Sequence, residues 1–352
     1  MSLDDGQYHL REQAFLRDAI LPILPFLEDP AVTEIMLNAD GCVWVDQAGR
    51  SLKTAVTMNP PKALAILRAV AGQADLQLTS ASPSLDAELR PWGARVKAAI
   101  PPITKAPVFT IRKPPARVFT LDEYVGAGII TGESAEVLKA AVRGKQNILV
   151  SGATASGKTT FVNALLAEIA RTEDRVFIVE DIPELQCASP NRVQYHVQPP
   201  FTTRLAIMDA LRSRPDRIVV GEVREGGAAL ELIKAWNTGH PGGTGTLHAN
   251  DNRQALNRLC QLIEEVVQRA PREIIAETVN VCVHIRRDPR LRGQRRLAGL
   301  HFVRGLTADG SWDLVPVASA RQLEQLIAAR AEASLLGPAL GLEEGERAGG
   351  TG

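Results

Sequence analysis

Residues 150–165 read VSGATASGKTTFVNAL, and this short stretch constrains the fold more tightly than the rest of the sequence does. An apolar run ends at Ser151, a loop framed by two glycines follows, and apolar residues at helical spacing come after a lysine and two threonines. Residues 152–159 have the spacing G-x-x-x-x-G-K-T. Such glycines let several backbone N–H groups face one concavity, so the stretch predicts a strand, a phosphate-binding loop and a helix.

The residue types in this loop are suited to a nucleotide with its metal ion. Lys158 can reach the β- and γ-phosphates, and the hydroxyl of Thr159 can bind Mg²⁺. A helix that starts near Gly157 adds its positive end. We therefore predict that nucleotide is bound by Gly152, Ala153, Thr154, Ala155, Ser156, Gly157, Lys158, Thr159 and Thr160, with Thr159 as the metal ligand.

The sequence after residue 134 predicts an α/β domain with a mostly parallel sheet. Apolar, β-branched runs occur at 147–151, 175–180, 217–223, 243–249 and 279–285, and helical patterns separate most of them. Strands that are apolar throughout are typical of a sheet covered on both faces. Two more strand patterns, at 295–303 and 311–317, are joined by Thr-Ala-Asp-Gly and predict a terminal hairpin.

The first part of the chain has a different pattern. Residues 34–50 predict two strands joined by an Asn-Ala-Asp-Gly turn, and residues 61–72 have the spacing of a helix. Further strand patterns lie at 84–89, 94–103 and 107–113. Short strands with few crossover helices favour an antiparallel sheet in a smaller α+β domain.

These patterns predict four segments along the chain. Residues 1–113 form the N-terminal α+β domain, and residues 114–134, rich in proline and glycine, form a linker. The α/β domain with the phosphate-binding loop covers residues 135–340. Residues 341–352 are glycine-rich and charged, which predicts a disordered tail.

Composition excludes several classes of protein. The chain has 352 residues with 40 basic and 40 acidic side chains, so its formal net charge is zero. This disfavours a surface that coats nucleic acid, although a local basic patch is still compatible. No apolar run approaches the roughly 20 residues that span a bilayer, and the acidic, polar N-terminus is unlike a secretory signal. The four cysteines form no CxxC pair, which favours buried, reduced thiols in a cytosolic protein.

Acidic residues follow two of the predicted parallel strands. Glu222 comes two residues after the apolar run 218–220, and Glu180 and Asp181 end the run 175–180. Ligands of parallel sheets bind at the carboxyl ends of the strands, so these acids are expected near the phosphate loop. There an acid can orient or activate water for hydrolysis. An aspartate commonly stands on the metal side of such a strand, whereas here the place is taken by Gly221.

A histidine follows a third strand of the predicted sheet. His248 closes the run 243–249, after a glycine-rich segment around His240 that we expect to be mobile. Histidine can hydrogen-bond a γ-phosphate and respond to its loss. The spacing of the six histidines does not suggest a metal site.

Four segments together resemble the secretion ATPases of type II and type IV systems. They are GATASGKTT at 152–160, VFIVEDIPEL at 176–185, the stretch 211–251 that contains GEVR and GHPGGTGTLH, and the upstream strands within 84–114. Within that superfamily the chain is most similar to conjugative-transfer ATPases of the TrbB type. The similarity covers roughly residues 30–300, and the GEVR and GHPGGTGTLH segments are more specific than the phosphate loop.

The resemblance implies a RecA-like domain, a hexameric ring, and ATP with Mg²⁺ bound between the two domains. It makes Glu180 the acid of the Asp box, Glu222 the acid of an atypical Walker B motif, and His248 the end of the His box. It also matches Arg112 to an arginine that reaches the phosphates from the N-terminal side, with Arg117 a weaker candidate. It further implies partners among inner-membrane secretion or conjugation components, and a cytoplasmic location peripheral to the inner membrane.

Departures from the family pattern leave alternatives open. Many relatives have a glycine-rich turn where this chain has ELRPWGAR around Trp92, and the absence of a CxxC insert disfavours the type II secretion branch. An ATPase of type IV pilus assembly or retraction shares the same catalytic segments. Gly221 also leaves open a nucleotide-gated scaffold that hydrolyses little ATP. A nucleic-acid motor on the same core is disfavoured by the neutral charge and few aromatics. The transported substrate, DNA or protein, is not specified by these motifs.

Overall fold

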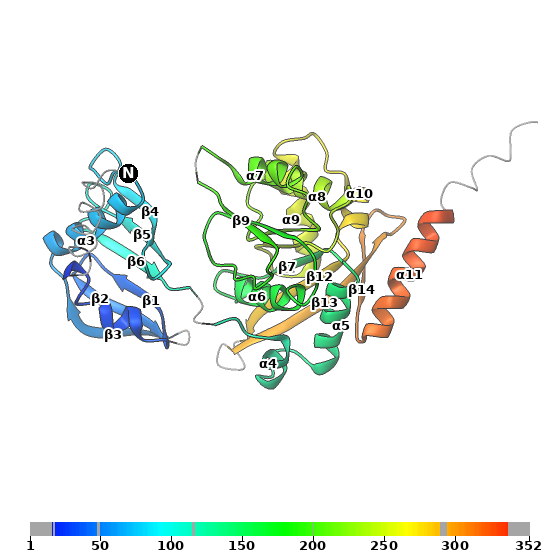
Figure 1. The fold of residues 1–352 in the computed structure, drawn as a ribbon, viewed down its shortest axis with the longest axis horizontal. Helices are drawn as coiled ribbons and strands as arrows, with labels where there is room; N and C mark the ends of the chain where they lie inside the picture. The colour runs from blue at the N-terminus through cyan, green and yellow to red at the C-terminus, as the bar shows by residue number, and fades with distance from the viewer. Residues whose placement is uncertain are drawn as a thin grey trace, which may run out of the picture. The chain divides into compact units, whose positions relative to one another are not determined.

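The computed structural model describes residues 16, 18–47, 50–114, 117–198, 200–288 and 294–336. The chain divides into two compact units (Figure 1). Apart from the short segment 182–184, the first unit ends at Arg117 and the second begins at Val118.

The first unit is built on a six-stranded antiparallel sheet, as its sequence pattern predicts. The strand order is β3-β2-β1-β6-β5-β4, and every neighbouring pair is antiparallel. Helix α3 begins after Asn59, whose side chain accepts a hydrogen bond from the Lys62 N–H, and it packs its apolar face into the core of this unit. Trp92 packs against the same core. The elements are α2 (Leu24–Glu28), β1 (Val32–Leu37), β2 (Cys42–Gln47), β3 (Arg50–Thr57), α3 (Pro60–Gln73), β4 (Ser84–Leu89), β5 (Ala94–Ala99) and β6 (Val108–Arg112).

The second unit contains an eight-stranded sheet in the order β14-β13-β12-β7-β11-β10-β8-β9. Six strands, from β12 to β9 in this order, run parallel, and the terminal hairpin of β13 and β14 adds to them in antiparallel fashion. The mostly parallel sheet predicted from the apolar runs is therefore confirmed. The strands are β7 (Ile148–Ser151), β8 (Val176–Glu180), β9 (Arg192–His196), β10 (Arg217–Val220), β11 (Thr244–Leu247), β12 (Val281–Asp288), β13 (Gln294–Leu306) and β14 (Trp312–Pro316).

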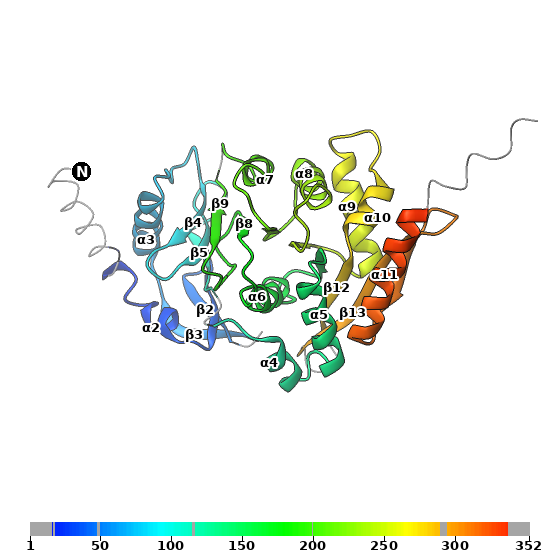
Figure 2. The ribbon, with the colours of Figure 1, turned by 45° about the vertical axis from the view of Figure 1, so that its right-hand side comes forward.

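Helices cover both faces of this sheet (Figure 2). One apolar cluster joins the sheet to α7, α8, α9 and α10, and the other joins it to α4, α5, α6 and α11. The central strands β7, β8, β10 and β11 are buried at every position, which explains why the sequences of β7, β8 and β10 are mostly apolar without alternation. The helices are α4 (Leu121–Gly126), α5 (Gly132–Arg143), α6 (Lys158–Ile169), α7 (Thr203–Ala210), α8 (Gly226–Asn237), α9 (Asn252–Glu264), α10 (Arg272–Thr278) and α11 (Ala320–Leu336).

The segment 114–134, expected to be a linker, contains regular structure in its second half. The Thr120 hydroxyl accepts a hydrogen bond from the Glu123 N–H, and the Glu123 carboxylate accepts one from the Thr120 N–H, so a capping box starts α4. Leu121 and Tyr124 are buried in the core of the second unit. The predicted tail at 341–352 lies outside the described residues.

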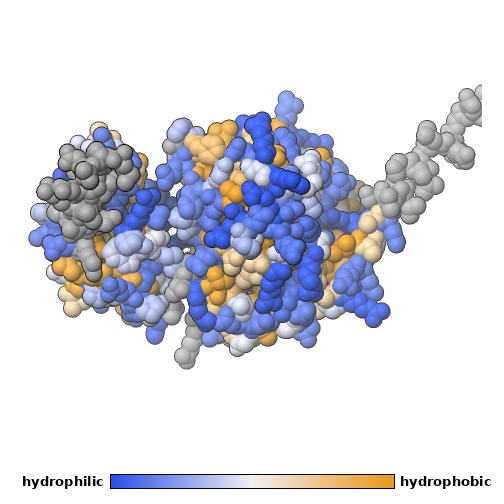
Figure 3. All heavy atoms as spheres, in the orientation of Figure 1, coloured by the Kyte–Doolittle hydropathy of each residue, from blue (hydrophilic) through white to orange (hydrophobic). Residues whose placement is uncertain are grey.

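The surface carries few large apolar side chains. In Figure 3 hydrophilic residues predominate on the visible face of the second unit, interrupted by small apolar areas. None of the helices in the described ranges has the length and apolar character needed to cross a membrane. On the face that Figure 3 shows, this unit therefore presents a mainly hydrophilic surface.

Candidate nucleotide-binding site

The loop between β7 and α6 has the backbone geometry of an anion site. Ala155 and Gly157 have φ angles of 58° and 97°, in the left-handed region, and Gly157 is the N-cap of α6. A Cβ on Gly152 would lie 2.3 Å from the Ile285 carbonyl oxygen, so only glycine fits there. Alternation of left- and right-handed residues forms a nest of backbone N–H groups, and the helix adds its positive end.

Two side chains of the loop suit a phosphate group. Lys158 is buried, and its Nζ donates to the carbonyl oxygens of Gly152 at 3.0 Å and Ala153 at 3.1 Å. The hydroxyl of Ser156 is buried and has no hydrogen-bond partner within the described part of the chain. A buried hydroxyl without a partner is costly, and a phosphate oxygen would accept its hydrogen bond. Thr159 and Thr160 lie in the first turn of α6.

Lys158, His248 and Glu222 lie in a row at the carboxyl edge of the sheet. His248 follows β11 directly, and its Nδ1 is 3.2 Å from the Lys158 Nζ while its Nε2 is 2.7 Å from Glu222 Oε1. An ammonium group can only donate, so Nδ1 accepts and the ring proton lies on Nε2, towards the carboxylate. Oε1 is buried and has no well-directed hydrogen-bond partner among the described groups, although His248 Nε2 is close to it. It keeps the capacity to accept a further hydrogen bond, including one from a bound water molecule.

Arg224 binds the second carboxylate oxygen of Glu222. Its Nη2 donates to Glu222 Oε2 at 2.5 Å, and its Nη1 donates to Asp181 Oδ2 at 2.6 Å. Burial alone would raise the pKa of Glu222, but the hydrogen bond from Arg224 and the charges of Arg224 and Lys158 outweigh it and hold this pKa below its usual value. Glu222 is therefore ionised at neutral pH.

Glu180, by contrast, is fixed in the protein interior at the end of β8. Its Oε2 accepts from the Leu185 N–H at 2.9 Å, its Oε1 accepts from the Gln194 amide, and His196 Nε2 lies 3.5 Å from Oε1. A Cβ on Gly221 would lie 3.0 Å from the Glu180 Cβ. Gly221 stands where an aspartate is common in such strands. Glu180 of the neighbouring strand crowds this position, which gives a physical reason for the glycine.

The glycine-rich segment before β11 is packed, contrary to the expectation of mobility. Asn147 Oδ1 accepts from the N–H groups of Gly242 at 2.8 Å and Gly243 at 3.0 Å. A Cβ on Gly243 would lie 2.1 Å from the indole nitrogen of Trp236. His240 contacts the Pro215 carbonyl oxygen at 2.8 Å. Here the glycines permit close packing.

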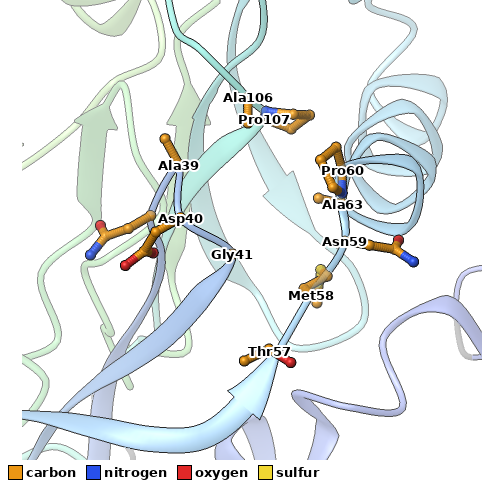
Figure 4. Close-up of a pocket in the computed structure, with 11 residues that line it drawn as sticks. Ala39, Asp40, Gly41, Thr57, Met58, Asn59, Pro60, Ala63, Ala106 and Pro107 are labelled. Carbon is orange, nitrogen blue, oxygen red and sulfur yellow. The ribbon is translucent and has the colours of Figure 1, made fainter.

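Arg112 belongs to the first unit. It lies on β6, where its Nε donates to Glu34 Oε1 at 2.8 Å, and its side chain is 42% exposed. The same unit has an open cavity of about 400 Å³ between the turn at Asn38–Gly41 and the residues from Thr57 to Pro60 (Figure 4). Its lining includes the carboxylate of Asp40 and no lysine, arginine or histidine, so it is not suited to phosphate.

The donor set agrees with Mg²⁺ held mainly by substrate. The described residues contain no group of three or more histidine, cysteine or acidic side chains that could hold a metal ion. Mg²⁺ characteristically keeps several waters and binds few protein groups together with substrate phosphates. A hydroxyl at Thr159 and an ionised Glu222 acting through water fit this pattern.

Sequence reasoning missed three arginines at this edge. Arg224 stands in the GEVR segment, two residues after Glu222, and this spacing was an available signal. Arg287 donates from Nε to the Ala155 carbonyl oxygen at 3.0 Å, and the side chain of Arg295 lies against Gly157. Only the pairing of β12 with β13 brings these two to the loop, so the sequence pattern gave no signal for them.

Comparison with known proteins supplies the family. The family model for type II/IV secretion system protein matches residues 18–299. The conjugal transfer protein TrbB of Rhizobium radiobacter is 41% identical over 273 residues, covering 77% of this chain and 84% of that protein. A probable conjugal transfer protein TrbB of Sinorhizobium fredii is 42% identical over 271 residues, covering 76% of this chain and 83% of that protein.

A solved structure shares the fold. The pilus retraction motor PilT, determined with bound ADP, has a TM-score of 0.60 at 19% sequence identity, covering 90% of this chain and 89% of that chain. The matched family model and the two relatives show that the chain belongs to the type II/IV secretion system protein family, whose conjugal transfer members it resembles along most of its length.

Proposed function

We propose that the chain binds ATP with Mg²⁺ at the phosphate loop and hydrolyses it to drive a conjugative or type IV secretion system. The observation that carries this proposal is the row of Lys158, His248 and Glu222, which joins the phosphate loop to an ionised carboxylate. A phosphate site beside a charged acid, one of whose oxygens has no well-directed hydrogen-bond partner among the described groups, has the parts that nucleotide hydrolysis requires.

Each residue of the row has a distinct task in this proposal. Lys158 leaves the loop carbonyls and binds the β- and γ-phosphates, while Glu222 accepts a hydrogen bond from the attacking water and orients it. His248 lies between them, with its Nε2 towards Glu222 and its Nδ1 towards Lys158, and responds to the γ-phosphate. Thr159 would hold Mg²⁺ through its hydroxyl, and the ion would supply charge neutralisation at the phosphates. Glu180 is a positioning residue, because both of its oxygens are already bound within the protein.

The wider parts of the proposal rest on family membership. We assign the chain to a hexameric ring at the cytoplasmic face of the inner membrane, where it acts with membrane components of the secretion or conjugation system. Arg112 of the first unit is proposed to contribute its charge to the nucleotide phosphates. The motor of a type IV pilus is the nearest alternative in function, since PilT shares the fold.

A scaffold that binds ATP and hydrolyses little is the second candidate. Glu222 is held on Oε2 by Arg224, and Gly221 supplies no acid on the metal side. An acid locked in an ion pair is a weak base, which favours slow turnover.

The test of the proposed function is phosphate release with ATP and Mg²⁺. Lys158→Ala is expected to lose nucleotide binding and turnover, because the loop loses its one buried cation aimed at phosphate. Lys234→Ala, which removes an exposed lysine of α8 in the same unit, is the control and is expected to match the wild type. Turnover by Lys158→Ala at the wild-type rate would show that hydrolysis does not depend on this loop and would overturn the proposal.

A further inference from the structure

Two arginines face each other across the hairpin of β12 and β13, beside the phosphate loop. Arg287 and Arg295 are register partners on these antiparallel strands, so their side chains leave the same face of the sheet. That face is the one covered by α6, because Ile285, two residues before Arg287, packs into the cluster that contains α6. Both guanidinium groups therefore lie towards the end of the sheet where α6 begins.

Both side chains reach the loop itself. Arg287 Nε donates to the Ala155 carbonyl oxygen at 3.0 Å. A Cβ on Gly157 would lie 2.7 Å from Arg295 Nε and 2.8 Å from its Cδ, so the absence of a side chain on Gly157 makes room for this arginine. The two arginine side chains thus lie against Ala155 and Gly157, the loop residues whose backbone is left-handed.

The charge of this pair is not balanced by nearby acids. Like charges directly opposite on neighbouring strands destabilise a sheet. The ion pairs formed within the described ranges include Arg296 with Asp288, at 4.0 Å, but none that involves Arg287 or Arg295. An anion between the two guanidinium groups would remove the repulsion, and a phosphate accepts such planar donors in pairs.

The strand order of the sheet indicates which end of a bound nucleotide would lie beside Arg287 and Arg295. Glu222 and His248 follow β10 and β11, on one side of β7, whereas the arginines lie on β12 and β13, on its other side. The acid and histidine mark the γ-phosphate end, because hydrolysis occurs there and Lys158 reaches both the loop and His248. The other side of the loop is left for the nucleoside end.

We propose that Arg287 and Arg295 form a clamp on the nucleoside end of the bound nucleotide, with their guanidinium groups on its α-phosphate. This inference rests on the proposed function, since it concerns the same loop. It adds an affinity determinant that does not take part in hydrolysis. The clamp holds ADP and ATP alike, because both carry the α-phosphate.

The experiment measures the Kd of ADP and of a non-hydrolysable ATP analogue by titration calorimetry. Arg287→Ala/Arg295→Ala is expected to raise both Kd values in the same proportion, by about tenfold or more, since bonds between charged groups are lost. The control, Arg286→Ala/Arg296→Ala, removes the next pair in register, which leaves the opposite face of the same strands, and is expected to leave both Kd values unchanged.

The outcomes separate this inference from the proposed function. Binding of both nucleotides by the double variant with wild-type Kd values overturns the clamp alone. A loss confined to the ATP analogue also overturns it, because the arginines then act on the γ-phosphate, and tighter binding would mean that they obstruct the loop. If wild-type protein binds neither nucleotide, the proposed function fails and the clamp fails with it. A melting temperature shared by the two double variants shows that folding is not the cause of a difference.

Discussion

At the scale of the residue, charge decides what Glu222 can do. A carboxylate placed near a γ-phosphate must stay ionised although burial favours the neutral form. Arg224 makes this possible, since it forms the strongest opposing contact to the carboxylate and bridges to Asp181. The ion pair with Arg224 fixes Oε2 of Glu222, and Oε1 is left as the oxygen that can accept a hydrogen bond from water.

This arrangement predicts the acid limb of the pH–rate profile. The folded pKa of Glu222 lies below its usual value of 4.5, so its charge, and any stability it provides, is complete above the unfolded pKa and is lost as the pH falls through the folded pKa. The acid limb of kcat is therefore expected below pH 4.5 in wild type. Arg224→Ala removes the lowering contact and is expected to move the limb to higher pH. Identical limbs in the two proteins would show that Arg224 does not tune Glu222.

At the scale of the element, the sequence predicted what depends on periodicity. The buried strands β7, β8 and β10 are apolar at most positions, and this pattern is typical of strands covered on both faces. Strand β9 was missed because it is an edge strand, half-buried and mixed in composition. Helix α4 was missed because prolines and glycines around it hid the capping box of Thr120 and Glu123.

The site was predictable to a similar extent. Loop residues and strand-end acids follow from spacing, because parallel strands bring their carboxyl ends to one edge. The positions of Arg287 and Arg295 do not follow from spacing, since they depend on the register of an antiparallel hairpin. The preference for Glu222 over Glu180 as the acid near water also required the contacts of each carboxylate, which the two sequence segments do not reveal.

A buried ion pair anchors the opposite end of β10. Arg217 is 1% exposed, and its guanidinium pairs with Asp174 at 2.7 Å while donating to the carbonyl oxygens of Val142 and Gly242. Burial opposes the charge on Asp174, but Lys145 and Arg217 lower its pKa. This pair ties β10 to α5 and to the glycine-rich segment before β11.

Breaking this pair is expected to be costly. Asp174→Asn leaves the buried Arg217 without its charged partner and should lower the free energy of unfolding by about 3–5 kcal/mol. Urea denaturation measures the change. Asp313→Asn, which breaks an exposed pair with Arg304, serves as the control and should cost at most about 1 kcal/mol. Equal losses in the two variants would contradict the anchoring role of Arg217 and Asp174.

At the scale of the whole molecule, the parallel sheet places three groups of candidate site residues along one edge. The phosphate loop follows β7, Glu222 and His248 follow β10 and β11, and the proposed arginine clamp lies on the hairpin of β12 and β13. A nucleotide along this edge would contact the clamp at its nucleoside end and Glu222 at its γ-phosphate.

The most direct measurement is phosphate release from ATP by Glu222→Gln beside wild type. The substitution keeps the size of the side chain but removes its charge, so turnover is expected to fall by about 10²–10⁴-fold while ATP remains bound. Glu225→Gln, three residues along, changes an exposed acid that makes no capping bond to α8 and is expected to turn over like wild type. Turnover by Glu222→Gln at the wild-type rate would contradict the account and leave the chain, in this respect, a nucleotide-gated scaffold or an ATPase with a different catalytic acid.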